Sequence, residues 1–428
     1  MKNIKIIIGK GKNPDSFCRI MYIIEAALEY FIAMMVADAY LAKICKSIGM
    51  TDGDIGVLSA FVSLGCGMQI AAVFIAGRMP VKKMVCTGTL ITNLCFVLVY
   101  LTPFFSVKKG AKSVILIVLL LSAQLIKNVV HSPKIDWFMS FVSDSERGIF
   151  TANKEIISLI GGMVFTFAMG VTIDAFEAAG DLYGGFLVSA ITVFALGVLH
   201  ILTMILTKDK PQERTASGSR FSLKSLVSDK CLMKIVLFSV LWHVVNYSTT
   251  PFYGAYKVDS LGFTMTFNSI LTVGYSIIRS VVSRPMGRFA DRRSFASMMT
   301  LCFVILSASL FVNIFTVPSN GRIMFTMYYI LYAVAMAGIN SGVINLLYDY
   351  VPHEKRTASF AFQNTVSGLA GFGTTWLVSR IVEYIQQSGN MLFGINIYAQ
   401  QAVSAIGFLF SIAGIMYLVF VVKRIPRS

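Results

Sequence analysis

The chain has little charge for its length: of its 428 residues, 14% are Asp, Glu, Lys or Arg and 56% are hydrophobic. A typical soluble protein carries roughly 25% charged residues, so this shortage excludes an ordinary soluble enzyme. The abundance of apolar residues likewise excludes a disordered chain. The net charge is +16, but beside so much apolar sequence it does not indicate a nucleic-acid-binding protein. We therefore predict a protein embedded in a lipid bilayer.

Residues that hold metals or act as nucleophiles are scarce too. There are four histidines and seven cysteines, and the cysteines are spread without C-x-x-C spacing, which favours small packing residues over metal ligands or disulfides. We find no nucleotide-binding P-loop, no H-E-x-x-H helix and no Ser–His arrangement. We therefore expect no cofactor, no metal and no enzymatic activity, and a membrane-embedded enzyme or receptor is the less favoured alternative.

Long apolar segments fill most of the chain. About 20 apolar residues are needed to cross 30 Å of hydrocarbon as a helix, and the sequence has twelve such segments, six on each side of a charged linker at 208–230. We predict an all-α membrane protein with twelve transmembrane helices in two six-helix bundles, 1–207 and 231–428. The predicted spans are 17–42, 54–77, 84–106, 113–142, 150–175, 184–207, 231–256, 265–286, 297–317, 323–350, 357–386 and 396–422.

Lysine and arginine gather in alternate loops between these spans. One side of the predicted membrane holds 22 of them and the other holds 7. Because cytoplasmic loops carry the excess of Lys and Arg, we expect both termini and the central linker to be cytoplasmic. The Lys-rich N-terminus has no small-residue cleavage site after it, so we expect it to be retained. The predicted location is the cell membrane, as a multi-pass protein.

The two halves of the chain resemble each other. Residues 146–162 match residues 355–371 at a constant offset of 209, and residues 48–51 match residues 261–264. Parallel repeats are found in many transporter folds, so we predict an internal duplication. The matched residues are Glu146, Arg147, Gly148, Ala152, Ser158 and Gly162 with Lys355, Arg356, Thr357, Ala361, Ser367 and Gly371, and Ile48-Gly49-Met50-Thr51 with Leu261-Gly262-Phe263-Thr264.

One loop carries a family resemblance. Between predicted spans 8 and 9 the chain reads Gly287-Arg288-Phe289-Ala290-Asp291-Arg292-Arg293, which resembles the G-x-[LF]-[AS]-D-R loop of the major facilitator superfamily. A tight turn favours Gly, and an Asp at a helix start can accept backbone N–H bonds and meet an Arg. The resemblance implies two bundles that rock about a midplane site and a protein that works as a monomer. It also implies a cytoplasmic gate, for which we expect Gly287, Asp291, Arg292, Arg78, Arg147 and Arg356.

The first-half copy of this loop departs from the family pattern, because Gly77 stands where the family has Asp. The resemblance therefore gives no acidic gate residue in the first half. The patterns of proton-coupled drug antiporters, a Gly-Pro pair in span 5 and R-x-x-Q-G in span 4, are missing as well. This disfavours multidrug efflux.

Few ionisable groups lie inside the predicted spans. Each costs at least about 2.5–3.5 kcal/mol at the membrane centre, so it needs a partner, water or a proton. Glu25 and Glu29 share one face of span 1, and Gln124, Lys127, His131 and Lys134 share one face of span 4. We expect Glu25 and Glu29 to face Lys127 and His131, with repulsion between the carboxylates favouring a proton on one of them. The alternative is a static Glu–Lys pair that only joins the two helices.

The family resemblance places spans 1, 4, 7 and 10 around a central cavity, and polar residues concentrate in these spans. His200, in span 6, is expected to be a packing residue. The residues expected to line the substrate cavity are Tyr22, Gln124, Asn128, Trp242, His243, Asn246, Tyr247, Tyr332 and Asn340.

These patterns predict a secondary active transporter that moves a small organic solute by alternating access, coupled to protons. The expected partners are an unidentified small-molecule substrate, H+ and the lipid bilayer, with no nucleic acid. A uniporter and a lipid or drug efflux flippase are the alternatives on the same fold. Lys127 and His131 would favour an anionic group if both glutamates were protonated.

Overall fold

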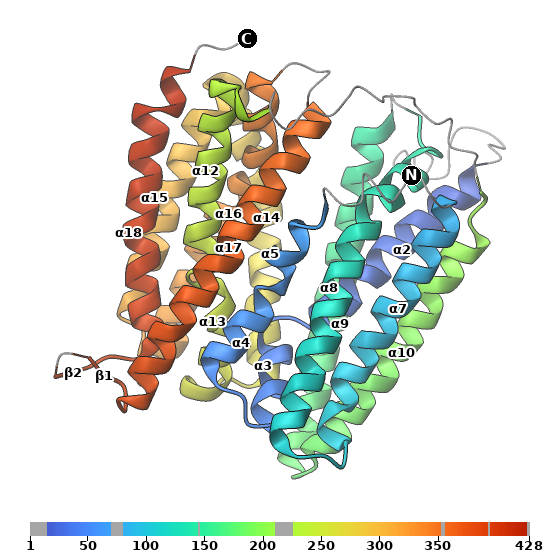
Figure 1. Cartoon of the computed structure of the whole chain (residues 1–428), viewed down its shortest axis with the longest axis vertical. Helices are drawn as coiled ribbons and strands as arrows, with labels where there is room; N and C mark the ends of the chain where they lie inside the picture. The colour runs from blue at the N-terminus through green and yellow to red at the C-terminus, as the bar shows by residue number, and fades with distance from the viewer. Residues whose placement is uncertain are drawn as a thin grey trace. The chain divides into compact units, whose positions relative to one another are not determined.

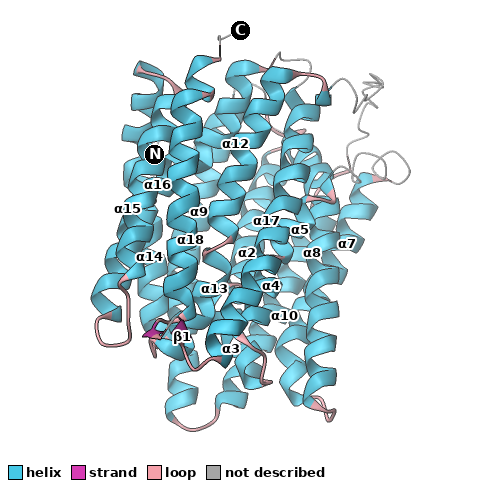
Figure 2. Ribbon diagram, turned by 60° about the vertical axis from the view of Figure 1, so that its left-hand side comes forward, coloured by secondary structure: helices cyan, strands magenta, loops and turns pink. Residues whose placement is uncertain are grey.

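The computed structural model describes residues 15–69, 80–143, 146–209, 226–351, 356–392 and 394–425. The chain forms two compact units. Unit 1 comprises Met1–Gly49 and Met68–Gly218, and unit 2 comprises Met50–Gly67 and Ser219–Ser428. Apart from one short hairpin, the described elements are helices (Figure 2).

Unit 1 is built from helices that pack in a fixed order. Helix α2 packs against α9 and α10, and α7 packs against α8 and α10, so that α7, α8 and α10 run side by side (Figure 1). Its elements are α2 (Ser16–Met35), α3 (Asp38–Ser47), α7 (Val81–Leu101), a 3-10 turn (Thr102–Phe104), α8 (Lys109–Met139), α9 (Arg147–Ala178) and α10 (Leu182–Leu206).

Unit 2 repeats this order with different helices: α12 packs against α17 and α18, and α15 packs against α16 and α18. Strand β1 (Met391–Leu392) pairs antiparallel with β2 (Ile395–Asn396). The helices are α4 (Asp52–Ser59), α5 (Phe61–Cys66), α12 (Lys230–Tyr247), α13 (Thr250–Ala255), a π-helical turn (Tyr256–Ser260), α14 (Met265–Arg292), α15 (Phe295–Ile314), α16 (Gly321–Tyr350), α17 (Arg356–Gln387), α18 (Ala399–Phe420) and a 3-10 turn (Val422–Arg424).

The backbone shows the internal duplication predicted from the sequence. Gly49 and Gly262 both adopt a positive φ, 86° and 60°, a conformation that glycine reaches without strain. Two residues later, Thr51 caps α4 by accepting a hydrogen bond from the Asp54 N–H at 3.1 Å, and Thr264 caps α14 in the same way. The matched tetrapeptides therefore perform the same structural task in both halves, which confirms the duplication.

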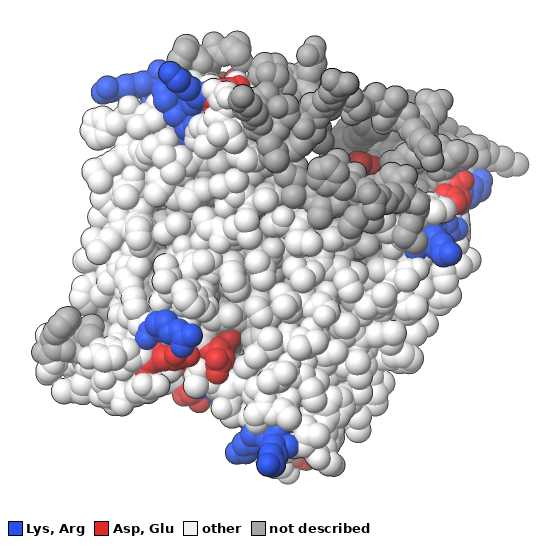
Figure 3. Space-filling view, in the orientation of Figure 1, with Lys and Arg blue, Asp and Glu red and all other residues white. Residues whose placement is uncertain are grey.

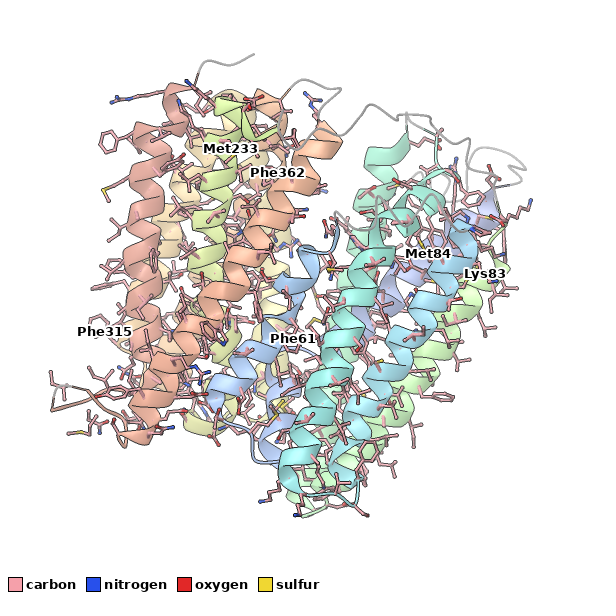
Figure 4. The ribbon with its side chains drawn as sticks, viewed as in Figure 1. Phe61, Lys83, Met84, Met233, Phe315 and Phe362 are labelled. Atoms are coloured by element: carbon pink, nitrogen blue, oxygen red, sulfur yellow. The ribbon has the colours of Figure 1, made fainter. Side chains whose placement is uncertain are left out.

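The length and composition of the helices suit a bilayer. Among the described residues, eight helices are long and apolar enough to cross a membrane, and nine if α2 and α3, bent by 42°, count as one span. Each of the twelve predicted spans contains at least one helix, which confirms the all-α membrane fold. Apolar side chains such as Val164 and Phe315 are 68% and 54% exposed, and Figure 4 shows Phe315 at the outer edge of its unit. Charged side chains in the face shown by Figure 3 lie near helix ends.

Two expectations about individual segments are wrong. Span 1 is not one helix, because the chain breaks after Met35 and restarts at Asp38, whose φ is +48°. Gly287 does not form a turn: α14 continues to Arg292, and a Cβ at Gly287 would meet no atom within 4 Å. Asp291 therefore lies in the last turn of a helix and not at a helix start. The helix runs through Pro285 and Gly287, and the Asp291 and Arg292 side chains are exposed at its end.

Residues 50–67 belong to the first half of the sequence but pack in unit 2, with α4 against α13 and α17 and α5 against α17. Asp52 is 1% exposed, and its Oδ2 accepts hydrogen bonds from Gln386 at 2.7 Å and Gln400 at 2.8 Å. Ser63 donates to the Gly368 carbonyl at 2.9 Å. The predicted division at 208–230 stays a prediction, and it does not anticipate this placement of residues 50–67.

Candidate functional site

A cluster of charged side chains is buried inside unit 1, between α2, α8 and α10. Lys134 of α8 is 4% exposed, and its Nζ lies 2.8 Å from Glu25 Oε1 and 2.6 Å from Glu29 Oε2. One ammonium reaches both carboxylates because Glu25 and Glu29 are four residues apart and so lie on the same face of α2. Such a pair is stable at membrane depth only when its charges are matched and hydrogen-bonded.

The cluster continues to α10 and α7 through His200 and Asn93. His200 Nε2 lies 3.2 Å from Glu25 Oε1, and its Nδ1 lies 3.3 Å from the Asn93 amide nitrogen. Because an amide nitrogen only donates, Nδ1 accepts, and Nε2 of the neutral ring then donates to Glu25. His200 is thus a member of the charged network, and the prediction that it is a packing residue is incomplete. An ionisable side chain in an apolar span was the signal that could have found it.

The other end of the cluster is more open. Lys127 Nζ lies 3.6 Å from Glu29 Oε1, and these side chains are 28% and 23% exposed. A small cavity lies between Glu29, Lys127, Lys134, Thr92 and His200. The volume of this cavity is about 20 Å³, which is room for one or two water molecules. Within the described part of the chain, the buried Thr92 Oγ1 has no hydrogen-bond partner.

Tyr22 and His131 occupy different surroundings. Tyr22 is 2% exposed and stacks on Phe138 at 4.6 Å between ring centroids. Lys154 of α9 lies over the same ring, 4.5 Å from its centroid, and donates to the Tyr22 hydroxyl at 3.2 Å. Tyr22 therefore holds a lysine that the sequence patterns did not single out. His131 is half-buried and forms no hydrogen bond or ion pair with any described residue.

Gln124 and Asn128, expected to line the cavity, are buried on α8 in unit 1. The Asn128 amide donates to the Gln124 carbonyl at 2.9 Å and accepts from Gln69 at 3.4 Å. The side chain of Asn128 thus joins the backbone of Gln124 to the side chain of Gln69. They add hydrogen-bonding capacity to unit 1 but no charge.

A second polar group lies in unit 2, on α12 and α16. Asn246 Oδ1 accepts hydrogen bonds from the Tyr332 hydroxyl and the Thr250 hydroxyl, both at 3.1 Å. His243 stacks on Tyr247 at 5.8 Å with an interplanar angle of 16°. Three of the residues predicted for the cavity therefore lie on adjoining turns of α12, and a fourth, Tyr332, meets them from α16. Tyr332 in turn stacks on Tyr275 and Tyr328.

The structure does not bring the remaining predicted residues to these groups. Trp242 is 7% exposed and packs edge-on against Phe303, 6.0 Å between centroids, because it faces the apolar side of α12; it is a core residue. Asn340 is exposed on α16. Of the predicted gate residues, Asp291 and Arg292 are exposed in the last turn of α14, the Arg356 Nε donates to the Val351 carbonyl, the side chain of Arg147 is not described, and Arg78 lies outside the described residues.

Comparison with known proteins assigns the chain to a family. The sequence model described as "Major Facilitator Superfamily" matches residues 20–375. The chain belongs to this family. A comparison with curated protein sequences found no match. Membership in the major facilitator superfamily agrees with the duplicated helix order of the two units and with the resemblance of residues 287–293.

Solved structures of major facilitator transporters share the fold. A mutant of the nucleoside transporter NupG matches with a TM-score of 0.74 at 14% identity, covering 94% of this chain and 99% of that one. The D-xylose-proton symporter matches with a TM-score of 0.72 at 12% identity, covering 95% and 98%. A bacterial homologue of the human lysosomal transporter Spinster matches with a TM-score of 0.70 at 13% identity, covering 97% and 98%. At these identities the likeness shows the fold alone.

Proposed function

We propose that this major facilitator superfamily protein is a proton-coupled secondary transporter that moves a small organic solute by alternating access. It works as a monomer in the cell membrane, with both termini cytoplasmic, and it is not an enzyme. The observation that carries the proposal is the position of Glu29. Its carboxylate belongs to a buried ion-pair network, yet it borders a cavity large enough for water and is 23% exposed.

Glu29 is better placed than Glu25 to carry a proton. Glu25 is 1% exposed and is held by Lys134 and His200, both buried. A proton on Glu25 would remove the more deeply buried of the two negative charges that face Lys134, and it would need a path into the core. A proton on Glu29 leaves Lys134 paired with Glu25 and releases only Lys127, which is partly solvated. The charge of Glu29 can therefore change without stranding a buried ion.

The polar group of unit 2 supports a solute that forms hydrogen bonds. Asn246 and His243 of α12 and Tyr332 of α16 offer an amide, an imidazole and a hydroxyl. Planar side chains beside hydrogen-bonding groups suit small ring-containing or polar molecules. Proteins of the same fold include a nucleoside transporter and a D-xylose-proton symporter, which supports this class of solute and a proton as the coupling ion.

The test is transport by the purified protein in proteoliposomes. A panel of sugars, nucleosides, amino acids and carboxylates is offered with and without an imposed pH gradient, for wild type, Glu29→Gln and Glu25→Gln. The matched control is Glu177→Gln, which breaks the ion pair of Glu177 with Lys43 on the same unit, outside the cluster.

We expect the pH gradient to drive solute uptake or efflux in wild type and in Glu177→Gln. Glu29→Gln is expected to lose gradient-driven flux while it retains exchange of labelled for unlabelled solute. Flux that ignores both the gradient and Glu29→Gln would indicate a uniporter instead. Movement of a fluorescent phospholipid between leaflets, with no flux of the soluble panel, would indicate a flippase.

A further inference from the structure

The buried polar cluster of unit 1 has more cations than anions. Lys127, Lys134 and Lys154 face Glu25 and Glu29, which leaves one lysine without a carboxylate among these five residues. Lys154 lies within electrostatic range of Glu25 and Glu29, and also of Glu155 beside it on α9, so it belongs to the same charge distribution. A surplus cation inside a membrane-embedded unit is unfavourable unless something negative complements it.

Lys154 is the lysine of this cluster that forms no ion pair with a carboxylate of the described residues. Its contacts with the described residues are the ring and the hydroxyl of Tyr22. A cation–π contact is worth about 0.5–2 kcal/mol but supplies no negative charge. Tyr22 is fixed by stacking on Phe138 and Phe150, so the ammonium of Lys154 is held at a defined position beside the Tyr22 ring.

The other charged residues nearby do not neutralise this surplus. Arg19 is buried, but it forms its own ion pair with Glu146 at 2.8 Å. Asp136 and Glu155, the carboxylates next to the cluster, are exposed and therefore screened by solvent. The imidazole of His200 bonds to Glu25, and His131 adds a further group that can become positive but not negative.

The surplus increases when Glu29 takes a proton. Among the described residues, Glu29 is the carboxylate paired with Lys127, and their contact of 3.6 Å is the longest ion pair of the cluster. With Glu29 neutral, Lys127 and Lys154 would both lack a carboxylate, and the cluster would carry two positive charges more than negative ones. The cavity beside Lys127 also contains the buried hydroxyl of Thr92, which finds no partner among the described residues.

We propose that the transported solute is an anion with a carboxylate or phosphate group, and that its negative charge is complemented by Lys154, held in place by Tyr22, and by Lys127. This inference rests on the proposed transport function and names its substrate class. A proton on Glu29 removes the negative charge that faces Lys127, and the bound anion supplies a negative charge in its place. Proton and anion would enter the site together for an electrostatic reason.

The experiment measures binding without any gradient, so that it does not depend on proton coupling. The thermal unfolding midpoint of the purified full-length protein in detergent is recorded with matched acid and neutral compounds at equal concentration: glutamate and glutamine, lactate and lactamide, glucose 6-phosphate and glucose, uridine monophosphate and uridine. A ligand that binds only the folded protein raises the midpoint by mass action. The phosphate and carboxylate arms distinguish the two kinds of anion.

We expect at least one acid to raise the midpoint where its neutral partner does not. For that acid, Lys154→Gln is expected to raise the half-saturating concentration about tenfold or more, because one charge-assisted contact is lost. For Lys154→Arg, the half-saturating concentration is expected to stay within about threefold of the wild-type value. Lys83→Gln, at the exposed end of α7 (Figure 4), is the control and is expected to behave like wild type. If Lys154→Gln does not yield folded protein, Lys127→Gln carries the same comparison.

Three outcomes overturn the proposal: equal stabilisation by acids and their neutral partners, stabilisation by neutral compounds alone, or no stabilisation by any acid. An acid whose affinity is the same in wild type, Lys154→Gln and Lys127→Gln also overturns the assignment of these lysines. The proposed function fails separately, when gradient-driven flux survives Glu29→Gln. The two ideas can therefore be refuted independently.

Discussion

Replacing Lys134 by Gln removes the cation that both carboxylates of the cluster share. Lys134 is 4% exposed and lies 2.6 and 2.8 Å from its two partners. Breaking a buried pair by removing one member typically costs about 3–5 kcal/mol, because the remaining charge stays buried. For a unit of about 200 residues this corresponds to a fall of the unfolding midpoint on the order of 10 °C.

The reasoning is tested by a double-mutant cycle on the thermal unfolding midpoint. Glu25→Gln alone is expected to be milder than Lys134→Gln, because Lys134 keeps Glu29 as a partner. The double variant Glu25→Gln, Lys134→Gln then recovers part of the loss, since one of the two stranded carboxylates is gone. A coupling of about 1 kcal/mol or more is expected for groups in direct contact. Strictly additive effects, or a Lys134→Gln variant as stable as the exposed-site control Lys83→Gln, would refute the buried network.

Two further predictions concern packing and capping, and both are checked by the same unfolding measurement. Gly162→Val is expected to lower the free energy of unfolding by about 1–3 kcal/mol, because a Cβ there would lie 2.3 Å from the Tyr30 ring. Gly287→Ala is expected to leave the free energy of unfolding unchanged or to raise it by up to about 1 kcal/mol, since it adds a methyl group to open space within a helix. If Gly287→Ala destabilised the protein, that result would support a tight turn at Gly287 in place of the helix. Thr51→Ala removes the cap of α4 and is expected to cost about 0.5–2 kcal/mol; a variant as stable as wild type would show that the cap contributes nothing.

The sequence predicts the fold well because apolar length and repeated turn chemistry are local properties. The match of Gly49 with Gly262 and of Thr51 with Thr264 follows from backbone conformations that only a few residues satisfy. The turn expected at Gly287 failed for a related reason: a glycine permits a turn but does not impose one, and the surrounding residues are compatible with a helix.

The candidate site is only partly visible in the sequence. The spacing of Glu25 and Glu29 fixes a shared face of one helix, but it does not fix which level of α8 that face meets. The crossing of the helices puts Lys134, one turn beyond His131, at the centre in place of Lys127. His200 lies 175 residues from Glu25, so their contact depends entirely on how α10 packs against α2.

The position of residues 50–67 has a consequence for how the chain folds during synthesis. The Asp52 carboxylate finds Gln386 only after another 334 residues have been made, and Ser63 finds Gly368 after 305. At about 5–20 residues per second, this segment waits roughly 15–70 s for its partners. Asp52 is fully buried only when α17 and α18 exist, so the polypeptide cannot complete its native contacts in the order in which it emerges from the ribosome.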